Sequence, residues 1–169
     1  MTSSGDILAD AFERIRDEVH PAVNGLTAEE LAFRPDAESN SIAWLVWHLT
    51  RIQDDHVAGL DDGRQRWTTE GWVDRFALPL DPGDTGYGHD PETVALVTAD
   101  ARLLLDYYED VHQRTLRFLA TLSESDLEAV VDDRWDPPVT MRIRLVSVIA
   151  DDLQHVGQAA YVRGILQRR

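Results

Sequence analysis

The sequence of 169 residues contains no cysteine, and none of its basic residues is lysine. Without cysteine the chain cannot form disulfides, offer thiolate ligands to a metal, or attack a substrate with a thiol of its own. Any nitrogen ligands must therefore come from histidine, and any reactive thiol must come from another molecule. The exclusive use of Arg among the 16 basic residues favours GC-rich coding.

Basic residues are few beside acidic ones: 16 Arg stand against 31 Asp and Glu, which gives a formal net charge of -15. Such a chain repels a polyanion at long range, so nucleic acid is excluded as an expected partner. The sequence also lacks a basic amino terminus followed by an apolar segment, and no stretch approaches the ~18 apolar residues of a membrane span. We expect a cytoplasmic protein with one domain over residues 1–169.

Apolar residues recur at three- and four-residue spacing in four long segments, which predicts four amphipathic helices. The first runs from Asp6 to about Val23, and the second begins near Ser41. The third starts at Pro91 and extends to Leu122 as the longest element, and the last ends near Gln167. This pattern predicts an all-α protein, a four-helix bundle of the up-and-down type with ligand sites between facing helices.

A long irregular loop separates the second and third predicted helices. Pro and Gly are too frequent in it for a regular element, and a loop of this length is usually functional or disordered. Four aromatic residues indicate that it is packed: Trp67, Trp72, Phe76 and Tyr87. Pro137 and Pro138 exclude helix from a second irregular segment before the last helix.

Polar side chains occupy the apolar faces of the second and last helices. Asp151 and His155 lie one turn apart, the spacing by which a single helix donates two metal ligands. His48 lies on the apolar face of the second helix, and Asp55 is on the same side, where it can orient His48 or accept a proton. Burying such groups without a partner costs several kcal/mol, and a metal would supply that partner. The alternatives are a hydrogen-bonded core histidine and a local ion pair between Asp151 and His155.

Other polar residues near these faces have weaker patterns. Asp152 does not share the metal spacing, and we interpret it as a surface acid or as a support for the ligands. His56 and His112 lie on apolar arcs, which favours hydrogen-bonded core histidines. His89 lies in the long loop, where a polar residue that faces a site is normal, and its alternative is a turn residue. Gln158 is a candidate to touch substrate or to brace the loop.

Three segments resemble the DinB/YfiT-like superfamily of metal-binding four-helix bundles, and most of all its actinobacterial branch of mycothiol transferase-like proteins. They are SIAWLVWHLTRIQDDH, GYGHDPETV and DDLQHVGQAAYVRGIL, and the match extends over nearly the whole chain. The resemblance implies His48 of the second helix, with Asp151 and His155 of the last, as the metal ligands. Asp151 departs from the family's His or Glu at its position. Its carboxylate is one methylene shorter than that of Glu, so it must lie closer to the metal or bind through a shifted helix.

The resemblance implies a divalent metal that activates a low-molecular-weight thiol, mycothiol, for S-transfer or for isomerisation of a small molecule. A metal stabilises a coordinated thiolate, which suits a chain without cysteine. Zinc is the first choice for two histidines and a carboxylate with an open position, and iron, nickel and manganese accept the same ligands. The alternatives are a thiol-independent metal-water hydrolase or non-haem-iron enzyme, and a non-catalytic stress protein that binds a metal or a small molecule.

Arginine and tryptophan residues are candidates for further contacts. Arg134 or Arg163 can meet a carboxyl or sugar hydroxyl group, and the long loop can form one wall of the thiol pocket. Trp44, Trp47 and Leu60 lie outside the main apolar stripes, where they can support a homodimer or cap the core.

Overall fold

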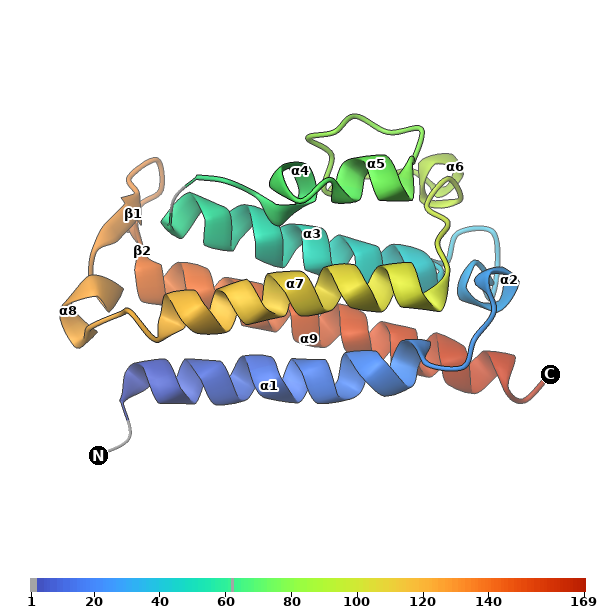
Figure 1. Ribbon diagram of the computed structural model, residues 1–169, viewed down its shortest axis with the longest axis horizontal. Helices are drawn as coiled ribbons and strands as arrows, with labels where there is room; N and C mark the ends of the chain where they lie inside the picture. The colour runs from blue at the N-terminus through green and yellow to red at the C-terminus, as the bar shows by residue number, and fades with distance from the viewer. Residues whose placement is uncertain (1–2, 62) are drawn as a thin grey trace.

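Figure 1 presents the computed structural model, which describes residues 3–61 and 63–169. Met1, Thr2 and Asp62, which the predicted domain includes, lie outside the described residues. In chain order, the elements are α1 (Ser4–Val23), α2 (Ala28–Leu31), α3 (Ile42–Leu60), α4 (Arg66–Thr69), α5 (Trp72–Phe76), α6 (Pro91–Val94), α7 (Ala101–Leu119), α8 (Glu124–Leu127), β1 (Val130–Asp132), β2 (Val139–Thr140) and α9 (Met141–Leu166).

The long helices α1, α3, α7 and α9 form a four-helix bundle, which confirms the predicted fold class. Both α7 and α9 pack against α1 and α3. However, α3 and α7 run in the same direction, opposite to α1 and α9 (Figure 1). The up-and-down order is therefore wrong at this step. The connection between α3 and α7, residues 61–100, is called the crossover here. It must return along the whole of α3, whose 19 residues span about 28 Å at 1.5 Å per residue. The crossover is therefore long because two parallel helices have to be connected.

One-sided apolar faces build the core. On α1, Phe12, Ile15 and Val19 are completely buried, and the Ser3 side chain caps the helix by accepting the N–H of Asp6. Within the described residues, no helix combines the length and apolar character needed to cross a membrane.

The third predicted helix is wrong in its start and its length. The short helix α6 ends at Val94, and α7 begins only at Ala101, where the Asp100 side chain accepts the N–H of Leu103 at 2.8 Å. Val97 in the intervening segment is buried, so its place in the predicted apolar stripe reflects burial rather than helix. The longest helix is α9, with 26 residues.

The crossover packs against the bundle. Trp67, Trp72 and Phe76 are buried, as expected, whereas Tyr87 is 90% exposed and the prediction is wrong for it. Tyr87 lies between two glycines with positive φ, Gly86 and Gly88, so the chain turns sharply there and directs its side chain to solvent.

Asp54, which the sequence pattern did not single out, fastens the start of the crossover to α3. Its side chain is completely buried. One carboxylate oxygen accepts the N–H of Arg66 and the other accepts the N–H of Trp67, both at 2.8 Å. The Tyr107 hydroxyl of α7 donates to the second oxygen at 3.0 Å. One carboxylate thus joins α3, α7 and the crossover.

A small antiparallel pair, β1 and β2, precedes α9 at one end of the bundle. Val130 pairs with Thr140 and Asp132 with Val139, and the turn between the strands contains a cis Asp136–Pro137 bond. This segment is free of helix, as its prolines predicted.

Candidate metal centre

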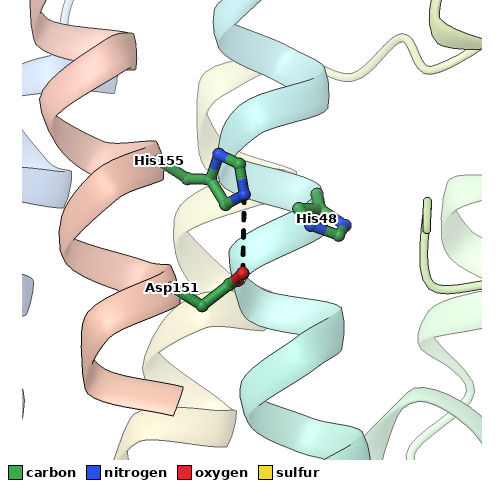
Figure 2. A group of neighbouring side chains, drawn as sticks. All are labelled: His48, Asp151 and His155. Carbon is green, nitrogen blue, oxygen red and sulfur yellow. Dashed lines mark ion pairs between the residues drawn. The ribbon is translucent and has the colours of Figure 1, made fainter. Parts of the chain in front are cut away.

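His48, Asp151 and His155 come together between α3 and α9 (Figure 2). Each offers one ligand atom, and these atoms lie within 4.8 Å of one another. The two residues of α9 face the same way because they are one turn apart (Figure 2), and the His48 ring of α3 lies beside them, with its centroid 4.8 Å from that of His155. The three residues selected from the sequence therefore form one cluster.

His48 is held by the crossover. Its Nδ1 lies 2.5 Å from the carbonyl oxygen of Thr85, and because a carbonyl can only accept, Nδ1 carries the proton. The other nitrogen, Nε2, then keeps its lone pair for a ligand. The imidazole stacks on the indole of Trp44 at 4.6 Å, and burial lowers its pKa. A neutral ring is the form that binds a metal.

His155 is oriented in the same way from within α9. Its Nδ1 donates to the side-chain oxygen of Gln158 at 2.9 Å, while its Nε2 lies 3.6 Å from Oδ1 of Asp151. Each histidine thus has Nδ1 held by an oxygen acceptor, and in its neutral form it presents Nε2 with a free lone pair. This is the arrangement that usually accompanies metal-ligating imidazoles.

The carboxylate of Asp151 completes a group of electron-pair donors. Its Oδ2 is buried and has no hydrogen-bond partner among residues 3–61 and 63–169. A proton on His155 would pair it with Asp151 alone, whereas a divalent cation would satisfy the two nitrogens and the carboxylate together. The residues present therefore fit a divalent metal. The shorter carboxylate does not prevent the approach, because Asp151 and His48 are both in the cluster.

Gly86 lets the crossover reach His48. A Cβ at this position would lie 2.8 Å from His48 Nδ1, closer than real Cβ atoms approach, and 3.1 Å from the Trp47 ring, which would have to shift. Its φ of +92° is also one that residues with a side chain rarely adopt. The Thr85 carbonyl could not be predicted from the sequence, because a main-chain acceptor has no side-chain pattern, although the adjacent "GYG" is typical of an unusual backbone.

The three candidate helpers have different positions. Gln158 contacts His155, as described. His89 accepts the indole N–H of Trp44 at 3.1 Å and donates to Asp84 at 2.9 Å, so it braces the crossover on α3 with both ring nitrogens in use.

Asp55 is turned away from the cluster. Its Oδ1 accepts from the side-chain amide of Gln65 at 2.6 Å, and Oδ2 lies 3.9 Å from His56. In the described chain it makes no hydrogen bond to His48.

The remaining acids and histidines lie outside the cluster. His56 lies 3.4 Å from an Arg144 nitrogen, and His112, which is completely buried, lies 3.5 Å from Glu13. Asp152 is also completely buried, so its interpretation as a surface acid is wrong. Burial, with the charge of Asp151, raises its pKa well above the usual value. Neither of its carboxylate oxygens has a hydrogen-bond partner among the described residues.

The tryptophans before His48 belong to the protein's own interior. Trp44 and Trp47 are 6% and 1% exposed and Leu60 is half-buried, so the structure supports their role in the core and not in a dimer. Arg163 donates to the carbonyl of Asn24 at 2.8 Å, which ties α9 to the end of α1.

Comparison with known proteins agrees with this architecture. The curated proteins contain no match. A crystal structure of a conserved protein from Enterococcus faecalis superposes with a TM-score of 0.93 at 30% sequence identity, and each chain is covered completely. The family model described as mycothiol-S-transferase matches residues 7–167, which confirms the resemblance seen in the sequence. The chain therefore belongs to the mycothiol-S-transferase family.

Proposed function

We propose that the protein binds one divalent metal through His48, Asp151 and His155 and transfers the sulfur of mycothiol to a small electrophilic substrate. One observation carries the metal site: one ligand atom from each of two imidazoles and one carboxylate lie within 4.8 Å of one another, while an oxygen acceptor holds Nδ1 of both histidines. Family membership supports mycothiol as the thiol.

The chain's residues would hold and orient the site. Thr85 and Gln158 fix the two imidazole rings in the tautomer that ligates. The side chains of Asp151 and His155 are 34% and 19% exposed, so a second molecule can approach from solvent beside them. Because three protein ligands leave a coordination position open, the site is suited to reaction and not only to structure.

His48, Asp151 and His155 would hold the metal, which when bound would supply the positive charge that favours a thiolate over a thiol near neutral pH. The protein has no cysteine of its own, so the attacking sulfur must belong to the co-substrate. Zinc suits this ligand set, and iron, nickel and manganese accept the same nitrogen and oxygen atoms.

Metal content tests the site directly. Tag-free protein purified without chelator should contain close to one equivalent of metal by elemental mass spectrometry, and the element found identifies the metal. His48→Ala should lose it. His20→Ala is the matched control, because His20 pairs with Glu109 away from the cluster and should leave the metal in place. Stoichiometric metal in His48→Ala, or metal-free wild type that is well folded, would refute the site.

Turnover tests the reaction. The wild type should accelerate conjugation of mycothiol to monochlorobimane, followed by fluorescence, and His155→Ala should not. Turnover of small esters or amides without thiol would instead support metal-dependent hydrolysis, and oxygen consumption would support an iron enzyme. Metal binding without any turnover would support a binding protein.

A further inference from the structure

A polar pocket of about 530 Å³ lies at the end of the bundle where α3 ends and α9 begins. The last turns of α3 form one wall, and β1 with the turn after it forms another. The polar residues that line it are Asp55, His56, Asp132, Asp133, Arg134 and Arg144. None of them belongs to the proposed metal site.

The pocket and the candidate metal centre both lie between α3 and α9. His56 follows His48 by eight residues on α3, and Arg144 precedes Asp151 by seven on α9. At 1.5 Å per residue these separations are about 12 and 10 Å along the two helices. Because α3 and α9 run in opposite directions, both displacements lead to the same end of the bundle. An elongated molecule can therefore contact the pocket and the cluster together.

The pocket walls are fixed by their own hydrogen bonds. Arg134 donates from Nε and Nη2 to the two oxygens of Asp132, each at 2.9 Å, and Arg144 donates to Asp132 at 3.1 Å. Arg144 also lies 3.4 Å from Nδ1 of His56. Asp132 is 6% exposed and held by both guanidinium groups, whereas the Arg134 side chain is 83% exposed and so remains open to a ligand.

The charges of the pocket nearly cancel, because two arginines face three aspartates and His56 has no positive charge when Arg144 donates to it. An anion would therefore gain no net attraction, and an apolar ligand would strip water from charged groups. Two groups at the mouth keep hydrogen-bonding capacity. Within the described residues, Nη1 of Arg134 and the carboxylate of Asp133 form no hydrogen bond, so one can donate and the other accept.

We propose that this pocket binds the hydroxyl-rich end of the thiol co-substrate, the glucosamine and inositol rings of mycothiol, while the sulfur lies at the metal centre. This inference rests on the proposed function. A neutral polyhydroxylated ring donates and accepts at every hydroxyl, which matches a pocket with both kinds of group and nearly balanced charge. Mycothiol is neutral at its rings because the glucosamine nitrogen is acylated. The pocket thus selects this thiol over smaller ones.

A thiol-free probe tests the pocket without turnover or metal. N-acetylglucosaminyl-inositol, titrated into ¹⁵N-labelled protein, should shift the amide signals of Asp133 and Arg134. Arg134→Gln should weaken binding at least about tenfold, the factor that one hydrogen bond to a charged group typically contributes. Asp133→Asn should weaken it as well, and it leaves the clamp on Asp132 intact.

Arg142→Gln is the matched control, because Arg142 pairs with Glu128 at the same end of the bundle but does not line the pocket. It should bind the probe as the wild type does. No binding at millimolar probe, shifts confined to another face, or equal losses in Arg134→Gln and Arg142→Gln would each overturn the proposal.

Kinetics separate this proposal from the proposed function. The ratio of kcat/KM for mycothiol to that for N-acetylcysteine, which lacks both rings, should fall at least about tenfold in Arg134→Gln. Wild-type turnover with no preference for mycothiol would overturn the pocket and leave the function standing. Probe binding in the pocket with no thiol turnover would overturn the function and support the pocket.

Discussion

Replacement of Asp54 by Asn should destabilise the protein strongly, whereas the same change at the neighbouring Asp55 should not. Asp54 is completely buried and accepts three hydrogen bonds, and its carboxylate lies 3.8 Å from Arg51 and 3.6 Å from Arg114. Asp55 is 42% exposed and accepts one hydrogen bond, from Gln65. Adjacent residues of one type thus provide a matched pair.

The expected loss in the free energy of unfolding can be estimated from the hydrogen bonds and charges that each variant retains. An amide at position 54 can accept from only one of the two N–H groups of the crossover, and its own NH₂ then faces the other donor. Arg51 also loses the buried carboxylate that lies 3.8 Å from it, whereas Arg114 keeps Asp61 at 3.3 Å. Breaking a buried ion pair on one side costs about 3–5 kcal/mol. Asn at position 55 can still accept from Gln65 and removes one exposed charge, which changes stability by no more than about 0.5 kcal/mol.

Urea denaturation followed by far-UV circular dichroism measures both variants. Asp54→Asn should lower the free energy of unfolding by at least about 3 kcal/mol, which corresponds to roughly 6–12 °C in Tm for a chain of this size. Asp55→Asn should overlay the wild type. If the two variants differ by less than about 1 kcal/mol, the reasoning that the carboxylate of Asp54 fastens the crossover is refuted.

Three further predictions concern the site and its surroundings. Gln158→Ala should weaken metal binding by about 10–100-fold in a chelator competition, because His155 loses the acceptor that orients its ring, and unchanged affinity would contradict this role. Gly86→Ala should cost about 1–3 kcal/mol in urea denaturation, because its Cβ would lie 2.8 Å from His48, and a wild-type midpoint would show that the crossover does not approach so closely. Burial lowers the pKa of His112, so the unfolded chain binds a proton more readily and stability should fall as the pH drops below about 6.5. His112→Phe should reduce that loss in unfolding measured from pH 8 to pH 5, and an unchanged slope would point to other groups.

The sequence predicted the features that depend on local spacing. The four long helices and the pairing of Asp151 with His155 follow from helical periodicity. His48 was predicted as the third ligand from its position on an apolar face and from the family resemblance. The structure brings these three together, while their ligation of a metal stays a prediction.

The features that depend on tertiary context could not be predicted. The break between α6 and α7 could not be seen in the sequence, because Val97 is buried in a loop three residues after Val94 and four before Ala101, which is helical spacing. The sequence does not show which of Asp54 and Asp55 is buried against the crossover, because that depends on the side of α3 that the crossover covers. The Thr85 acceptor is a main-chain atom, which no residue type specifies.

That main-chain acceptor has a consequence for how the site tolerates mutation. No side-chain substitution at Thr85 can delete its carbonyl, so a scan of all variants should find this position permissive, even though it supplies the partner of His48. The intolerance should fall instead on Gly86, which has no side chain and touches no metal. A mutational map of this protein would therefore mark Gly86 as essential and miss Thr85, whose carbonyl oxygen binds His48.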